Sequence, residues 1–311
     1  MALAAEPRTL RCVFTRPAST RMTTGTSRGL VAALRPVPLH ERHIIDQLIQ
    51  ERAETLLGRP VLGALGRAVL YPLLGYRDAV RVADTMAALR GFEAMAFLSG
   101  ELGLEVVVEN AEVLPREGAA LIVGNHPTGI ADGVVLFDAL APLRPDFAMF
   151  ANRDAVRVAP TLADLVIPVE WMPDRRSHAR MRETLKETHR AFRDERLVAM
   201  FPSGRLAWMD GEVLRERPWL PTAVGLARRH AVPLVPMHME GRNSGLFYLF
   251  SRLSTQLRDI TLFHEVLNKR GTRYRVTFGA PIDPERLEGD PEAVTARLQA
   301  HVESRFEVPF D

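Results

Sequence analysis

Seven short apolar runs in the later two thirds of the chain constrain its fold more than any other feature. They are residues 104–108, 119–123, 147–150, 166–169, 197–201, 234–239 and 274–278. Helical patterns intervene or follow at residues 131–141, 177–194, 220–230, 245–268 and 291–304. Strand-length runs that alternate with helices favour a parallel or mixed sheet with helices packed on it. We therefore predict an α/β fold with a mixed, mainly parallel sheet flanked by helices.

The residues before this pattern divide into a tail and an N-terminal helical segment. Residues 1–30 carry five arginines and one acidic residue, a composition that transit peptides share with disordered tails. We predict that residues 1–38 are a disordered tail without a transit role. Residues 39–102 show helical spacing of apolar residues. Their helices either pack on the α/β domain, residues 103–311, or place residues 70–76 in a membrane interface, where tyrosines favour the headgroup level.

Composition excludes several classes of protein. An apolar fraction of 47% with 25% charged residues is typical of a globular chain. A net charge of +2 gives no reason to expect nucleic acid as a partner. Cys12 is the single cysteine of the 311 residues, so neither an internal disulfide nor a cysteine-based metal site is expected. No stretch of 18 residues is apolar and uncharged enough to predict a membrane span.

The loop after the second apolar run contains a histidine and an aspartate. Its sequence from Asn125 to Asp132 is Asn-His-Pro-Thr-Gly-Ile-Ala-Asp. Strand ends in α/β sheets are where ligands and catalytic groups usually lie. A carboxylate can orient a histidine and stabilise its charged form, so His126 with Asp132 could take a proton from a hydroxyl. Alternatively, His126 caps the following helix and Asp132 is a solvated residue of its first turn.

Two later segments end in polar loops on the same expected sheet edge. The first is the turn Pro202-Ser203-Gly204 with Arg205, whose backbone N–H groups and guanidinium could face an anion. The second is the run 232–239, which leads to Asn243 and Ser244, both good helix N-caps. His238 alternates with apolar neighbours, so we interpret it as a hydrogen-bonded core histidine.

Taken in this order and spacing, the three segments resemble the glycerolipid acyltransferases, the PlsC-like family of 1-acylglycerol-3-phosphate and lysophospholipid acyltransferases. The resemblance covers roughly residues 100–285 and is closest to the hemolysin-like or ornithine-lipid branch. It implies that His126 is the general base and Asp132 its orienting partner, here with five residues between them instead of four. It also implies substrate-binding roles for Asn125, Pro202, Gly204 and Asn243.

Two positions depart from the family pattern. Ser203 stands where many members have a glutamate that helps to hold the acceptor, and Trp171 stands where they have a phosphate-binding arginine. Arg175, Arg176 and Arg205 are candidates to replace that arginine, and Ser203 remains a candidate substrate contact. Both departures make an acceptor of the glycerol-3-phosphate type less secure.

The resemblance implies an O-acyltransferase that moves a long acyl chain from acyl-CoA or acyl-carrier protein to a hydroxyl of a lysolipid. It implies no cofactor and no metal, and a peripheral location at the cytoplasmic face of a membrane. Backbone N–H groups of the turn at residues 202–205 could stabilise the oxyanion.

Three other interpretations stay open. One is a serine hydrolase that uses Ser203 or Ser244, although Gly-x-Ser-x-Gly is missing. Another is a non-catalytic lipid-binding adaptor of the same fold. A metal site of His126, Asp132 and His238 lacks the expected ligand spacing.

Overall fold

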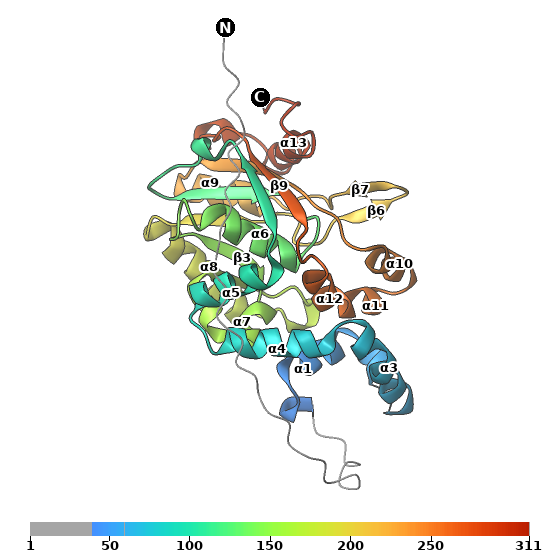
Figure 1. The fold of residues 1–311 in the computed structure, drawn as a ribbon. Helices are drawn as coiled ribbons and strands as arrows, with labels where there is room; N and C mark the ends of the chain where they lie inside the picture. The colour runs from blue at the N-terminus through green and yellow to red at the C-terminus, as the bar shows by residue number, and fades with distance from the viewer. Residues whose placement is uncertain (1–38, 59, 311) are drawn as a thin grey trace.

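A seven-stranded sheet forms the centre of the molecule, of which the computed structural model describes residues 39–58 and 60–310 (Figure 1). Its strands are β1 (Glu105–Glu109), β2 (Ala120–Gly124), β3 (Ala148–Asn152), β4 (Val166–Val169), β5 (Leu197–Met200), β8 (Leu234–Glu240) and β9 (Arg273–Phe278). The order across the sheet is β1-β9-β8-β2-β5-β3-β4. All neighbours pair in parallel except β8 and β9, where Met237 faces Phe278 in an antiparallel register. The prediction of a mixed, mainly parallel sheet is confirmed.

Helices cover both faces of this sheet. The alternation of side chains along β2 shows why, because Ala120 and Ile122 belong to one hydrophobic cluster while Leu121 and Val123 belong to the other. The strand is buried on both faces, as the continuous apolar run predicts. One face packs against α8 (His178–Arg193), α9 (Thr222–His230) and α13 (Pro291–Glu303). The other packs against α6 (Ile130–Leu140) and the N-terminal helices.

The N-terminal helices share this second core with the sheet. They are α1 (Ile44–Arg52), α2 (Glu54–Leu57), α3 (Pro60–Leu73), α4 (Tyr76–Ala87) and α5 (Gly91–Leu102). Ile45, Met86 and Leu98 of these helices pack in the same cluster as Ile122. The described part of residues 39–102 is thus mainly helical, as predicted. Of the two arrangements considered for these helices, the shared core supports packing on the α/β domain.

Three features differ from the elements expected. The helical pattern at residues 245–268 is three helices, α10 (Gly245–Leu253), α11 (Thr255–Ile260) and α12 (Leu262–Leu267). A short helix, α7 (Asp154–Val158), follows β3. A hairpin of β6 (Trp208–Asp210) and β7 (Val213–Arg215) forms a separate two-stranded sheet. The remaining elements are the 3-10 helices η1 (Leu39–Glu41), η2 (Ala111–Val113), η3 (Pro160–Asp164), η4 (Pro173–Arg175) and η5 (Pro284–Leu287).

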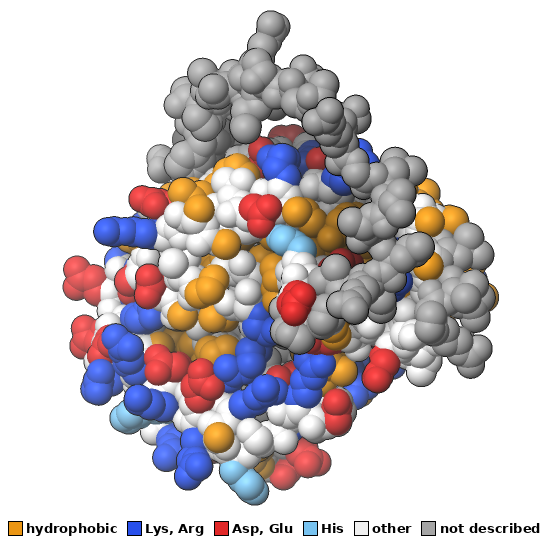
Figure 2. Space-filling model, turned by 90° about the horizontal axis from the view of Figure 1, so that it is seen from below, with side chains coloured by type: hydrophobic (Ala, Val, Ile, Leu, Met, Phe, Trp, Pro, Cys, Tyr) orange, Lys and Arg blue, Asp and Glu red, His pale blue; other side chains and the backbone are white. Residues whose placement is uncertain are grey.

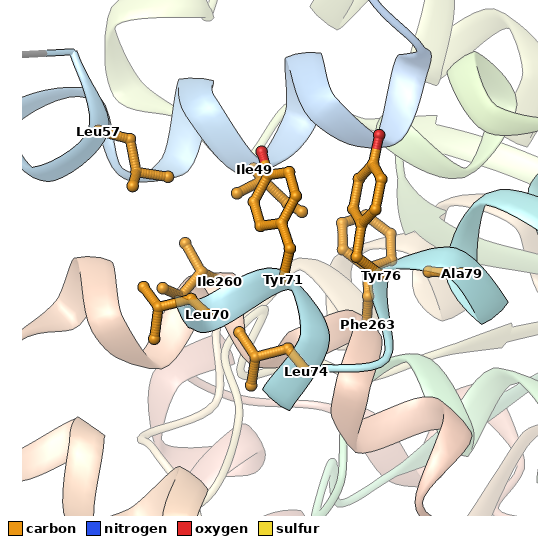
Figure 3. Close-up of a pocket in the computed structure, with 9 residues that line it drawn as sticks. All are labelled: Ile49, Leu57, Leu70, Tyr71, Leu74, Tyr76, Ala79, Ile260 and Phe263. Carbon is orange, nitrogen blue, oxygen red and sulfur yellow. The ribbon is translucent and has the colours of Figure 1, made fainter. Parts of the chain in front are cut away.

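The tyrosines of residues 70–76 face the interior. Tyr71 and Tyr76 stack with their ring centroids 4.2 Å apart, and the Tyr71 hydroxyl donates to Asp46 of α1. Both rings line a small apolar cavity of about 10 Å³ together with Ile49 and Phe263 (Figure 3). Of this segment, Leu73 is the large apolar side chain that is exposed. No helix within the described residues is long and apolar enough to cross a membrane. The predicted tail, residues 1–38, lies outside the described residues.

Candidate active site

The loop from Asn125 to Gly129 begins where β2 ends, between β8 and β5. Asn125 is buried, and its side-chain amide makes two hydrogen bonds with the main chain of Met239 in β8. Its Nδ2 donates to the Met239 carbonyl at 2.8 Å, and its Oδ1 accepts from the Met239 N–H at 2.7 Å. Asn125 therefore anchors the loop to β8 at the sheet edge. A role for Asn125 in substrate binding remains a prediction.

His126 and Asp132 are in contact. The Nδ1 atom of His126 lies 2.9 Å from Oδ2 of Asp132. The same carboxylate accepts hydrogen bonds from the backbone N–H groups of Thr128 and Gly129, each at 2.9 Å, and from the Thr128 hydroxyl. Asp132 is completely buried at the third position of α6, so it caps this helix but is not solvated. These donors and the N-terminus of the helix stabilise its negative charge.

The turn into α6 requires a glycine. Gly129 has a φ of 92°, in the region that residues with a side chain rarely adopt. A Cβ atom at this position would also lie 2.8 Å from Leu206 Cδ2. Gly129 thus allows the N–H groups of the loop to converge on Asp132.

The contact with Asp132 leaves Nε2 of His126 as the nitrogen that can accept a proton. The imidazole stacks on Phe201, which follows β5, with ring centroids 4.2 Å apart and an angle of 13° between the planes. The side chain of His126 is 20% exposed, so its ring can be reached from outside while its partner is shielded. A base with a fixed tautomer and one open nitrogen is suited to proton transfer.

The backbone of His126 is held by the β6–β7 hairpin. Its N–H donates to Glu216 Oε1 at 2.8 Å, and its carbonyl accepts from the Ala207 N–H at 3.0 Å. Burial raises the pKa of Glu216, although the hydrogen bond from His126 acts in the opposite direction. Sequence reasoning missed Glu216. The sequence feature that could have pointed to this segment is the hairpin, whose two-residue turn at Gly211 and Glu212 joins two short strands.

A second line of hydroxyl groups lies behind Asp132. The Thr128 hydroxyl donates to Asp132 and lies 3.1 Å from the phenol oxygen of Tyr274 in β9. Burial and the nearby Asp132 charge raise the pKa of Tyr274, so its phenol stays protonated and donates to Thr128. Neither residue was predicted, because Tyr274 is about 150 residues away in sequence and the alternation of β9 gives no sign of this contact.

The turn at residues 202–205 meets the site through Phe201. Pro202 and Ser203 are buried, and Gly204 has a φ of 59°. The Gly204 N–H donates to the Phe201 carbonyl at 3.0 Å, and the Ser203 hydroxyl donates to the Arg205 carbonyl at 2.8 Å. Proline has no N–H, so the Ser203 N–H remains the best candidate for an oxyanion donor in this turn. Arg205 is exposed.

Asn243 and Ser244 belong to a buried polar network. With its amide nitrogen facing the Glu265 carboxylate, Asn243 donates to Glu265 at 3.1 Å and to the Thr128 carbonyl at 3.2 Å. Ser244 caps α10 by accepting from the Phe247 N–H, as its position predicted. Burial opposes the ionisation of Glu265, but hydrogen bonds from Ser244 and Lys269 outweigh burial and lower its pKa. Asn243 is thus brought to the loop that carries His126.

Comparisons with known proteins find a family model that matches part of the chain. A family model described as Acyltransferase matches residues 105–240, which extend from β1 to β8 and include the His126 loop. This part of the chain is similar to that family.

Two curated relatives of this chain are each named lyso-glycine lipid O-acyltransferase. They come from Phocaeicola vulgatus and Bacteroides thetaiotaomicron, and each is 28% identical over 187 residues, or 58% of this chain. The match spans 65% of the first relative and 67% of the second. Among solved structures, the 1-acyl-sn-glycerophosphate acyltransferase PlsC from Thermotoga maritima has a TM-score of 0.46 and 16% identity, covering 83% of this chain and 96% of that one.

Two arginines predicted to bind phosphate are not brought to His126. Arg175 and Arg176 follow β4, which lies three strands from β2, a separation of roughly 14 Å at normal strand spacing. Arg175 forms an ion pair with Glu51 of α1 at 2.8 Å. Arg176 donates to the carbonyls of Glu170 and Trp171, each at 3.4 Å. Phosphate binding by these arginines remains a prediction, and it would require Arg175 to leave Glu51.

The competing site predictions find no support in the contacts of the described residues. Ser203 bonds to a carbonyl, and the Ser244 hydroxyl donates to Glu265 at 2.5 Å, so neither serine has a histidine partner among these contacts. His238 is half-buried and its Nδ1 lies 2.9 Å from the Val302 carbonyl, as expected for a core histidine. Within the described residues, no group of three metal-ligating side chains could hold a metal ion.

Proposed function

We propose that this chain is an acyltransferase that moves a long acyl chain from an acyl thioester to a hydroxyl of a lysolipid, with His126 as the general base. The observation that carries the proposal is the contact of His126 Nδ1 with the buried Asp132 carboxylate, which leaves Nε2 open. Both relatives are named lyso-glycine lipid O-acyltransferase, which supports a lysolipid acceptor that is acylated on oxygen.

The reaction needs few groups of the protein. His126 Nε2 takes the proton of the acceptor hydroxyl as its oxygen attacks the thioester carbonyl. The resulting oxyanion is stabilised by fixed N–H donors, of which Ser203 N–H is the candidate. The intermediate then expels the thiolate, which takes the proton from His126, and the histidine is neutral again. Because both substrates are bound together, no nucleophilic side chain is required.

The proposal includes a peripheral association with the cytoplasmic face of a membrane, because lipid acceptors reside there. Helix α10 supports it, since Leu249 and Leu253 lie four residues apart on the side of the helix opposite the buried Phe247. Leu249 is 53% and Leu253 66% exposed, and Arg252 is the single charged residue of this helix. An apolar stripe with a basic residue favours an anionic lipid surface.

Other exposed apolar side chains belong to elements on the same side of the molecule as α10 in the view of Figure 1. Helix α3, with the exposed Val69 and Leu73, and the β6–β7 hairpin, with Trp208, lie along the same side of the view in Figure 1. From below, charged side chains gather on the left and lower margin of the molecule, and hydrophobic ones show at its right margin (Figure 2). Replacement of the two exposed leucines of α10, Leu249 and Leu253, therefore tests lipid association.

The proposed activity is tested with purified protein, palmitoyl-CoA or palmitoyl-acyl-carrier protein, and a panel of lyso acceptors. The panel contains a lyso-glycine lipid, lysophosphatidate and lysophosphatidylcholine. We expect a diacylated product with at least one donor and acceptor pair, and release of one thiol for each ester formed. Thiol release without an ester product would support the hydrolase instead. Binding of lipid with neither reaction would support the adaptor.

A further inference from the structure

The two ends of the β6–β7 hairpin bind the two backbone groups of one residue, His126. Ala207, one residue before β6, donates its N–H to the His126 carbonyl at 3.0 Å. Glu216, one residue after β7, accepts the His126 N–H on Oε1 at 2.8 Å. The hairpin itself extends outward from the sheet (Figure 1). Ala207 and Glu216 together hold the main chain of His126, the proposed general base, and we call this pair of contacts the clamp.

Glu216 is an unusual choice for a purely structural contact. Its Oε2 atom is buried without a hydrogen-bond partner, and the buried indole Nε1 of Trp219 is in the same condition. The Ser203 hydroxyl and the Trp219 indole lie near the Glu216 carboxylate and favour its charged form. Neither group forms a hydrogen bond with Oε2. A buried carboxylate with an unsatisfied oxygen destabilises a fold, so such groups call for a functional explanation.

The direction of the His126 ring depends on three contacts from different segments. Asp132 holds Nδ1, Phe201 holds the ring face, and Glu216 holds the backbone N–H. The first two fix the tautomer and the plane of the ring. They do not fix where its Cα lies, because His126 is in a loop between β2 and α6. That position is set by the clamp.

We propose that Glu216 is a positioning residue of the acyl-transfer site, which fixes the main chain of His126 and with it the direction of Nε2. This inference rests on the proposed function. Glu216 contacts the backbone of the base, so under this proposal its loss slows the chemical step and leaves substrate binding unchanged. A displacement of about 1 Å in a reacting group can lower a rate by about 100-fold.

The test compares Glu216→Ala, Glu216→Asp and Glu216→Gln with the wild-type chain. Alanine removes the acceptor, and aspartate keeps the charge but is one methylene too short to reach His126 N–H. We expect both to lower kcat by about 10- to 100-fold, with KM for donor and acceptor within about twofold. Glutamine keeps an oxygen at the same distance and should restore kcat to within about threefold of the wild type. Glu212→Ala, an exposed residue of the hairpin turn, is the matched control and should change neither constant.

Amide hydrogen exchange at His126 provides a readout that does not need activity. We expect faster exchange of the His126 N–H in Glu216→Ala and Glu216→Asp, and near wild-type exchange in Glu216→Gln and Glu212→Ala. If the alanine variant does not fold, the aspartate and glutamine variants decide the question. Wild-type kcat in Glu216→Asp, a raised acceptor KM at unchanged kcat, or unchanged exchange would each overturn the inference. A wild-type chain without acyl transfer would contradict the proposed function, while the exchange contrast still tests the clamp.

Discussion

At the scale of single residues, Asp132 determines which nitrogen of His126 can act. The carboxylate accepts four hydrogen bonds within the described chain, from His126 Nδ1, two backbone N–H groups and the Thr128 hydroxyl. Such a carboxylate is rigid and keeps its charge close to the imidazole. It therefore favours the protonated histidine that forms as a hydroxyl is deprotonated.

Replacing Asp132 by asparagine should lower kcat by at least about 100-fold, because an amide oxygen accepts the backbone bonds but carries no charge to stabilise imidazolium. The thermal unfolding temperature should change little, since the helix cap is retained. Steady-state acyl transfer and a melting curve measure both quantities. Asp174→Asn, at an exposed position after β4, is the control. A kcat within threefold of the wild type would exclude Asp132 from the mechanism.

Asp138 makes the stability of the fold depend on pH. Burial raises the pKa of Asp138 to about 6, although the Ser99 hydroxyl donates to its Oδ1 at 2.5 Å. The folded chain therefore holds this proton more tightly than the unfolded chain. As pH rises from about 4 through 6, the folded state loses up to about 3 kcal/mol of stability from this group.

Asp138→Asn should remove this loss, because an amide keeps the acceptor for Ser99 and does not ionise. We expect the variant to be more stable than the wild type at pH 8 by up to about 3 kcal/mol and equally stable near pH 4. Urea unfolding at the two pH values measures the difference. A difference that does not change with pH would show that burial does not raise the pKa of this carboxyl.

The residues of the site divide into those that the sequence reveals and those that it conceals. His126 and Asp132 lie six residues apart, so one loop and one helix turn bring them together. Thr128 was visible in the same loop without a sign of its role. Glu216 and Tyr274 come from distant segments, and only the sheet order and the hairpin place them beside that loop.

At the scale of elements, the strands were the most predictable part. Each of the seven is found within two residues of its predicted run. The central strands β2 and β5 are buried at every position, so their sequences are continuously apolar, whereas β9 alternates buried and exposed residues. The helical pattern at residues 245–268 is confirmed, but it is divided into three helices. Ser254 adopts an extended conformation, with φ −163° and ψ 135°, and its hydroxyl caps α11. Serine and threonine compete with the helix for backbone groups, which explains the breaks at Ser254 and Thr261.

The exposed face of α10 predicts binding to a lipid surface. Leu249→Glu with Leu253→Glu should reduce co-sedimentation with phosphatidylglycerol vesicles by at least about tenfold, since two leucines that enter the interface contribute up to about 1.5–3 kcal/mol each. Leu185→Glu is the control, because Leu185 is 51% exposed on α8, which packs on the opposite face of the sheet from α6. Equal binding of the α10 variant and the wild type would show that α10 does not contact lipid.

At the scale of the whole molecule, the N-terminal helices and the α/β domain are joined by charge as well as by the shared core. The buried Arg52 of α1 pairs with Asp154 of α7 at 2.7 Å, and Glu51 bridges Arg157 and Arg175. This cluster lies beyond β3 and β4, away from His126. Arg175, one of the three arginines that the sequence proposed for phosphate, thus helps to hold two parts of the fold together. The sequence could not predict this ion pair, because only the tertiary structure brings together partners so distant in the chain.

The sheet brings the reacting groups to one edge. Strands β2, β5 and β8 are adjacent and parallel, so the loops that follow them, with His126, Phe201 and Asn243, share the same end. The alternation of strands and helices predicted this edge, but the strand order, and the reversal of β9 that brings Tyr274 behind the site, could not be read from it.

The central claim is that His126 is the general base of acyl transfer, and its replacement by alanine tests the claim most directly. The rate of ester formation from palmitoyl-CoA or palmitoyl-acyl-carrier protein is measured with the acceptor that the wild type uses best. His178→Ala, an exposed histidine at the start of α8, is the matched control. We expect His126→Ala to lower kcat by about 100- to 10,000-fold with an unchanged melting temperature, and His178→Ala to match the wild type. Wild-type rates in His126→Ala would contradict the account.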